Sequence, residues 1–171
     1  MANCTINEGH VLGCPLDSMG GVKEVYIANW SAATDYSVDA TDTITGITSG
    51  STYYLFEQVK ETSGVNETMV ADILTGSLIF EQKLSLVFNK MTADLRQTLM
   101  LLVRAYTTVI VKDQNGLYWI LGSENGLNLT EGTSGTGVAY SDRNGFAITL
   151  GAKERESIRP IAYSAFSSYI G

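Results

Sequence analysis

The sequence predicts a mainly β fold: an antiparallel β-sandwich or open barrel with one flanking α-helix. Several stretches alternate apolar and polar residues with the period of two that is typical of a half-buried strand. Only one segment, residues 93–106, repeats its apolar residues at helical spacing. Turn signals, among them two Asn-Gly pairs, separate the strand-like stretches, as in antiparallel hairpins.

The chain is expected to form an N-terminal arm, residues 1–21, followed by a single domain, residues 22–171. Its 171 residues suit one domain with a real hydrophobic core. In the arm, four glycines and a proline argue against regular structure. Beyond it, residues 22–29 alternate as a strand does, and residues 30–51 fit a loop with one short strand near 41–48.

The most informative region holds three strand-like stretches: residues 52–60, 66–74 and 77–90. In the last stretch one face is apolar except at Gln82, and we expect this face to pack on the helix. The apolar residues of that face are Leu78, Phe80, Leu84, Leu86 and Phe88. At about 3.3 Å per residue the strand reaches roughly 45 Å, longer than a usual globular strand. This length predicts that it pairs with neighbouring copies of the chain.

A single helix is predicted to follow this strand. Thr92 suits its N-cap, and Asp94 in the first turn complements the helix dipole. The helix is expected to end near Ala105, because residues 107–111 are β-branched. Its apolar stripe consists of Leu95, Leu99, Leu102 and Tyr106. Leu95, Leu99 and Leu102 complete the predicted sheet–helix core.

Two hairpins and an edge strand are predicted in the remainder of the chain. The first hairpin joins residues 107–111 to 117–121 through the turn Asp113-Gln114-Asn115-Gly116, whose Asn-Gly pair readily adopts positive φ. A Gly-, Thr- and Ser-rich loop is expected over residues 122–137. The second hairpin pairs residues 138–141 with 146–150 around Asn144-Gly145, and residues 157–162 are the edge strand.

The charge of the chain is acidic and unevenly distributed. The formal net charge is −7, with 18 acidic and 11 basic residues, and the whole imbalance lies in residues 1–90. An acidic surface repels phosphate, so tight nucleic-acid binding is disfavoured, whereas a channel wall past which DNA slides tolerates such charge. Charged residues make up only 17%, which suggests that partners cover part of the surface.

No catalytic, metal or cofactor site is expected, and we predict that the protein is not an enzyme. His10 is the only histidine, and its spacing to Cys4 and Cys14 fits no common zinc pattern. A nucleophilic triad requires a histidine or an equivalent base. Two cysteines form no disulfide framework, and neither a secretory signal nor a membrane span is expected.

Residues 153–159 (KERESIR) alternate in charge and have two interpretations. The simpler one is a solvated turn that leads into an edge strand. Alternatively, Lys153, Arg155 and Arg159 contact the acidic first half of a neighbouring copy, in a head-to-tail contact that can close into a ring.

The order of these segments resembles the tail-tube type of phage structural protein. The likeness rests on VKEVYIAN, FEQKLSLVFNK, ADLRQTLMLLVRAY, VIVKDQNGLYWILG and SDRNGFAITL. In particular, Gly20-Gly21-Val22-Lys23 before a strand and the D-x-N-G turn at 113–116 are similar to the small tube or ring subunits of phages that infect Bacteroidetes, including crAss-like phages.

This resemblance implies a homo-oligomeric ring, a hexamer or a dodecamer, in which protomers join their long strands into an inner barrel around a channel. It implies a subunit of a tail tube or head-to-tail connector, with other tail or portal proteins as partners and DNA passing without specific binding. The expected location is the phage tail or neck of the virion, after assembly in the host bacterial cytoplasm. Glu57, Glu81, Lys83 and Ser85 are the expected channel-facing residues, and the arm and residues 63–67 are expected to reach adjacent subunits or rings.

Two alternatives remain open at this stage. One is a capsid decoration or head-fibre base protein, which forms trimers on the capsid exterior. The other is a monomeric β-barrel that binds a small ligand in its core, which the apolar and aromatic strands suggest.

Overall fold

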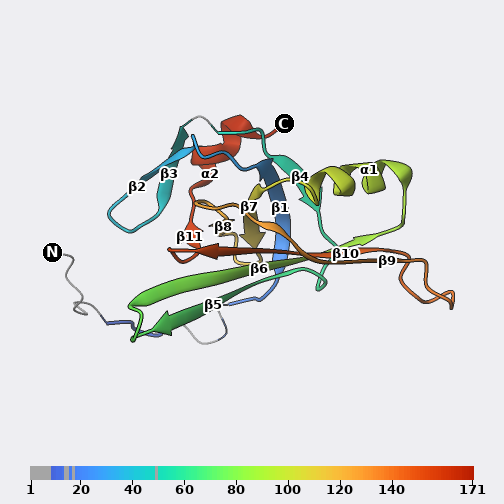
Figure 1. The fold of residues 1–171 in the computed structure, drawn as a ribbon, viewed down its shortest axis with the longest axis horizontal. Coiled ribbons are helices and arrows are strands. Elements are labelled where there is room, and N and C mark those ends of the chain that lie inside the picture. The colour runs from blue at the N-terminus through green and yellow to red at the C-terminus, as the bar shows by residue number, and fades with distance from the viewer. Residues whose placement is uncertain (1–8, 14–15, 17, 49) are drawn as a thin grey trace.

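The computed structural model describes residues 9–13, 16, 18–48 and 50–171, and they form two packed antiparallel sheets with one flanking helix (Figure 1). Strand makes up 49% and helix 11% of the structure, so the predicted mainly β sandwich is confirmed. In chain order the elements are β1 (Val22–Asn29), β2 (Asp35–Val38), β3 (Ile44–Thr48), β4 (Tyr54–Glu57), β5 (Gly64–Asp72), β6 (Ser77–Asn89), α1 (Ala93–Leu102), β7 (Thr107–Asp113), β8 (Tyr118–Leu121), β9 (Asn128–Gly135), β10 (Gly145–Glu154), β11 (Arg159–Pro160), α2 (Tyr163–Phe166) and the 3₁₀ turn η1 (Ser167–Tyr169).

The first sheet has five strands in the order β11-β8-β7-β1-β4. Its central strands β1 and β7 are buried on both faces, which explains the nearly unbroken apolar runs in their sequences. Val25 and Ile27 point to one side of the sheet, and Tyr26 and Ala28 point to the other. The strand predicted as half-buried for residues 22–29 is therefore buried on both faces over Val25–Ala28.

The second sheet has four strands in the order β5-β6-β10-β9. The longest strand, β6, pairs with β5 over Ser77–Ser85 and with β10 over Phe80–Asn89. Within one chain β6 is thus paired on at least one side along its whole length, and on both sides over residues 80–85. The prediction that this strand's length requires pairing with other copies is wrong, because two partners with different end points share its thirteen residues.

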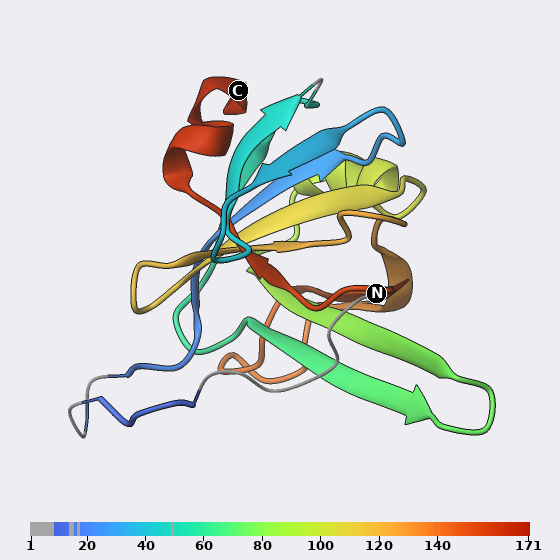
Figure 2. The ribbon, with the colours of Figure 1, turned by 90° about the vertical axis from the view of Figure 1, so that its left-hand side faces the viewer.

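The main core lies between these two sheets, and α1 closes one side of it. Leu84, Leu86 and Phe88 of β6 meet Leu99 and Leu102 of α1 there, and Leu95 packs at the edge. Leu78 and Phe80 do not belong to this core: Leu78 is 51% exposed and Phe80 is half-buried. They lie where the β5–β6 hairpin extends beyond the rest of the sandwich (Figure 2), so no second layer covers them.

A second, smaller core covers the opposite face of the five-stranded sheet. The β2–β3 hairpin and α2 supply its outer layer, with Ile44, Ile47 and Phe166 buried against Tyr26 and Ile110, among others. Phe166 contacts the rings of Tyr26, Tyr53, Tyr118 and Tyr163. The sequence patterns predicted neither β2 nor α2, because each is only four residues long.

The helix begins as predicted and ends earlier. The Thr92 hydroxyl accepts a hydrogen bond from the Leu95 N–H at 3.3 Å, so the predicted N-cap is confirmed. The helix ends at Leu102, and tighter turns follow to Ala105. Tyr106 therefore lies outside the helix and is exposed, although its ring contacts Trp30 edge-on.

The first predicted hairpin is confirmed, with Gly116 at a φ of +87° in the β7–β8 turn. The second is wrong. Residues 138–141 form no strand, and β10 pairs instead with β9, which lies within the predicted loop at 122–137. The predicted edge strand at 157–162 is reduced to β11, which pairs with β8.

Candidate assembly surface

The outer face of the four-stranded sheet is mainly polar outside the projecting end of the β5–β6 hairpin. Side chains alternate along β6, so that Leu84 and Leu86 enter the core while Glu81, Lys83 and Ser85 point outward. Across β6 and β10 the cross-strand pairs of this face are Glu81–Lys153, Lys83–Gly151 and Ser85–Thr149. Asn66, Thr68 and Glu131 extend it across β5 and β9.

Three of the four predicted channel residues therefore share one face. Glu57 does not: it lies on β4 of the five-stranded sheet, where it pairs in register with Glu24. The prediction grouped it with the others because the face of a short aromatic strand cannot be read from its own sequence.

The outer face carries nearly balanced charge. Lys153 Nζ lies 2.9 Å from Glu81 Oε1. This hydrogen bond and the positive charge of Lys153 lower the pKa of Glu81. Within the described residues, the adjacent Lys83 forms no ion pair.

The predicted interface bases are partly engaged within their own chain. Lys153 pairs with Glu81, as above, and Arg159 pairs with Asp42 at 3.2 Å and with Glu156. Arg159 thereby ties β11 to the β2–β3 turn. Arg155 has no ion pair within the described residues, and only its backbone N–H is bound, to Glu124.

The two terminal strands of this sheet, β5 and β9, are long, and no other strand of the described residues pairs with their outer edges. They have nine and eight residues, and each pairs on one side only. Proteins usually protect such edges with Lys, Pro or a covering segment. Neither strand contains Lys, Arg or Pro; β9 has a bulge near Thr130. Each edge therefore offers backbone donors and acceptors to another strand.

The projecting end of the β5–β6 hairpin is apolar on both faces. Met69 and Leu78 are exposed on one face and Val70 and Ile79 on the other. Ile73 and Leu74 in the hairpin turn are 96% and 97% exposed. The sequence pattern placed Ile73 and Leu74 in the strand predicted for residues 66–74, but β5 ends at Asp72 and both lie in the turn Asp72-Ile73-Leu74-Thr75-Gly76.

Loop 136–144, which joins β9 to β10 at the opposite end of the sheet, also exposes large apolar side chains. Val138 and Tyr140 are 103% and 112% exposed. Asp142 accepts hydrogen bonds from the N–H groups of Val138 and Ala139 at 2.9 and 2.8 Å, which lower its pKa. The loop is thus held by its own aspartate, with the two large apolar side chains outside.

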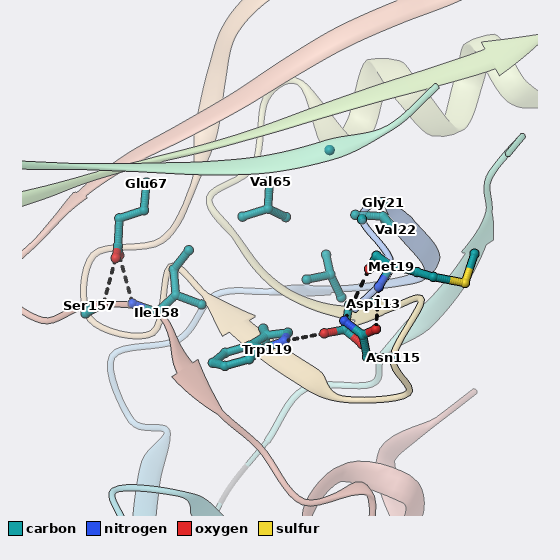
Figure 3. Close-up of a pocket in the computed structure, with 13 residues that line it drawn as sticks. Met19, Gly21, Val22, Val65, Glu67, Asp113, Asn115, Trp119, Ser157 and Ile158 are labelled. Atoms are coloured by element: carbon teal, nitrogen blue, oxygen red, sulfur yellow. Dashed lines mark hydrogen bonds between the residues drawn. The ribbon is translucent and has the colours of Figure 1, made fainter. Parts of the chain in front are cut away.

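A cavity of about 490 Å³ lies at the base of the arm (Figure 3). Val22, Val65 and Val111 supply apolar lining. Its polar groups bind one another: Glu67 accepts from Ser157 Oγ at 2.6 Å and from the Ile158 N–H at 2.8 Å. Asp113 accepts from Trp119 Nε1 at 3.1 Å.

Residues that line this cavity hold the start of the domain through hydrogen bonds. Asn115 Oδ1 accepts from the Met19 N–H at 2.8 Å, and Asn115 Nδ2 donates to the Met19 carbonyl at 3.2 Å. Gln114 N–H donates to the carbonyl of Gly21. The predicted D-x-N-G turn therefore anchors the end of the predicted arm to the sandwich.

No group of three or more His, Cys, Asp or Glu side chains among the described residues is placed to hold a metal ion. His10 is exposed, and Cys4 and Cys14 lie outside the described residues. The described helices include none with the length and apolar character that a membrane span requires.

Comparison with known proteins found no match for this chain. It matches no protein-family model, no curated protein sequence and no solved structure. Function must therefore be argued from the surface itself.

Proposed function

We propose that this chain is a virion structural subunit that assembles into a closed ring, or a stack of rings, around a channel through which phage DNA passes. In this role it belongs to a tail tube or a head-to-tail connector and performs no chemistry. The observation that carries the proposal is that β5 and β9, the terminal strands of one sheet, each have an outer edge with no strand partner among the described residues.

The directions of the strands support continuation of the sheet from copy to copy. Neighbouring strands in the order β5-β6-β10-β9 are all antiparallel. Because the number of strands is even, β9 of one copy runs antiparallel to β5 of the next copy around a rotation axis. A ring can therefore close with antiparallel pairing at every step. The contacts between its copies are heterologous, because β9 of each copy meets β5 of the next.

The stagger of the sheet also fits a ring. Measured along β6, β5 lies opposite Ser77–Ser85, whereas β9, through β10, lies opposite Lys83–Asn89. Full overlap of β9 with the next β5 requires a shift of about four or six residues per copy, since an odd shift would place core side chains on the outer face. With strands about 4.8 Å apart and 3.3 Å per residue, this gives a tilt of about 35° or 45°, the usual tilt of closed barrels.

The same geometry predicts the size of the ring. Each copy contributes about 25 Å of circumference, so six copies give a barrel about 50 Å across and twelve give about 100 Å. Both are wide enough for duplex DNA. On this wall the bases Lys83 and Lys153 are balanced by Glu81 and Glu131, so it offers no excess of positive charge to hold phosphates.

Electron microscopy of the purified protein at high concentration tests this proposal. We expect rings or tubes with a central hole and a diameter that follows from the counted copies as above. A protein that remains monomeric by light scattering at high concentration, across salt conditions, contradicts the proposal. Trimers without a hole favour a decoration protein instead.

A further inference from the structure

Each end of the four-stranded sheet carries an apolar surface that no other part of the described chain covers. At one end the hairpin turn, residues 73–76, presents Ile73 and Leu74. At the other end the distal loop, residues 136–144, presents Val138 and Tyr140. All four side chains are at least 96% exposed, and at each end they form a pair of large apolar side chains in contact with solvent.

Both surfaces are held in place before any partner arrives. Asp72 Oδ1 accepts from the Leu74 N–H at 2.9 Å, and the hydroxyls of Thr75 and Ser77 lie 2.9 Å apart across the hairpin turn. Asp142 holds the distal loop through the N–H groups of Val138 and Ala139. A fixed backbone lowers the entropy that binding must overcome, so both ends are suited to docking.

The two surfaces cannot meet within one copy. The hairpin turn precedes Ser77 and the distal loop precedes Gly145, which pairs with Asn89, so the length of β6 separates them by about 40 Å (Figure 1). A contact between them joins different copies head to tail. Such a heterologous contact does not close on itself along the sheet direction and instead propagates.

We infer that the hairpin turn of one copy docks on the distal loop of a second copy in the neighbouring ring. This inference rests on the proposed function, because strands tilted by about 35–45° place the two ends on opposite rims of a ring. Each rim then carries one type of apolar surface. Stacking buries Ile73 and Leu74 against Val138 and Tyr140, and every copy supplies both halves of the contact.

Two double variants test the contact. Ile73→Ser with Leu74→Ser removes the turn surface, and Val138→Ser with Tyr140→Ser removes the loop surface. All four positions are fully exposed, so we expect each variant to keep the wild-type circular dichroism spectrum and melting temperature. Each alone is expected to form rings of unchanged diameter that no longer stack, as seen by electron microscopy and sedimentation velocity. Leu117→Ser, at another exposed apolar turn residue, is the matched control and is expected to stack like wild type.

Mixing the two variants gives the decisive readout. The loop variant keeps an intact turn and the turn variant keeps an intact loop, so one contact can form between a ring of each. We expect ring pairs and no longer stacks. Unchanged stacking of either variant alone, or a mixture that forms no pairs, overturns the inference, and so does a wild-type protein that forms rings but never stacks.

The same mixture distinguishes failure of the turn–loop contact from failure of the proposed ring. If the wild-type protein forms no rings, the proposed function fails. The mixed variants then still report on the contact, because they pair as single chains in a one-to-one complex if it exists and remain separate if it does not.

Discussion

Gln82 is the single polar residue on the core face of β6, and the structure explains its presence. The side chain is 3% exposed, and its Oε1 accepts from the Gly122 N–H at 3.0 Å while its Nε2 donates to the Glu156 carbonyl at 3.3 Å. It therefore joins the loops that follow β8 and β10. The break in an otherwise apolar face was visible in the sequence, but its partners, 40 and 74 residues away, were not.

Replacing Gln82 with leucine is expected to destabilise the fold by about 1–3 kcal/mol, because the buried Gly122 N–H loses its acceptor. Urea unfolding of the variant and of wild type measures this difference in the free energy of unfolding. The adjacent change Lys83→Leu, on the outer face, is the control and is expected to stay within about 0.5 kcal/mol of wild type. Equal effects of the two changes would refute the role assigned to Gln82.

Gly145 is needed at its position, but for another reason than the predicted turn. The Asn-Gly pair predicted a tight turn with positive φ, but Gly145 begins β10, and a Cβ there would collide with the carbonyl oxygen of Phe88. Close approach of two backbones requires the glycine. Gly116 differs, because it has a φ of +87° and open space around it.

We expect Gly145→Ala to cost about 1–3 kcal/mol or more through overpacking against backbone that cannot move aside. Gly116→Ala is expected to cost about 1 kcal/mol, from its left-handed conformation alone. Thermal unfolding of both variants shows which of them loses more stability. A smaller loss for Gly145→Ala would show that the β6–β10 approach is looser than the structure indicates.

Glu154 predicts a pH dependence of stability. It is 2% exposed, and burial raises its pKa above the ordinary value of 4.5, although the N–H groups of Glu124 and Asn125 bind the carboxylate. A raised pKa in the folded state means that protonation favours folding. The stability contributed by this group is therefore full below pH 4.5 and decreases as pH rises from there to the folded-state pKa.

The variant Glu154→Gln lacks this titration. The stability of wild type relative to the variant should therefore fall as pH rises through that window, in urea titrations at a series of pH values. Parallel stability curves for the two proteins would contradict the raised pKa.

At the scale of elements, alternation predicted the central strands that cover the main core and missed β9. The core face of β6 from Leu84 to Phe88 and the N-cap of α1 followed from local sequence. In contrast, β9 is exposed on both faces over most of its length, so its Gly-, Thr- and Ser-rich sequence has no apolar period to detect. The length of β6 was read correctly, but its partners depend on pairing between distant segments.

The C-terminal layer was also missed, and it is expected to matter for stability. Phe166 of α2 is fully buried among four tyrosine rings. Phe166→Ala should cost about 3–5 kcal/mol in unfolding free energy, measured by urea denaturation. Tyr163→Ala, at the exposed edge of the same cluster, should cost clearly less; a reversal of this order would show that the layer is not packed as described.

At the scale of the whole molecule, the account depends on β9 of one copy pairing with β5 of the next. The length of β6 was the sequence-based reason for predicting assembly, and pairing within one chain accounts for that length. The proposed assembly depends instead on the outer two strands of the sheet. Glu81, Lys83 and Ser85 share one face of this sheet. Their place in a channel, and the roles of Lys153, Arg155 and Arg159 at an interface, remain predictions.

Disulfide cross-linking between these edges tests the pairing directly. In a chain with Cys4 and Cys14 replaced by serine, Glu131→Cys is combined with Thr68→Cys, for a shift of four residues, or with Val70→Cys, for a shift of six. Within one copy β5 and β9 are about 14 Å apart, beyond the roughly 7 Å that a disulfide spans, so only neighbouring copies can cross-link. We predict that one of the two pairs gives a non-reducing gel ladder that stops at the copy number of the ring, while single-cysteine chains give no ladder. Oligomers in which neither pair cross-links would contradict the edge-to-edge ring.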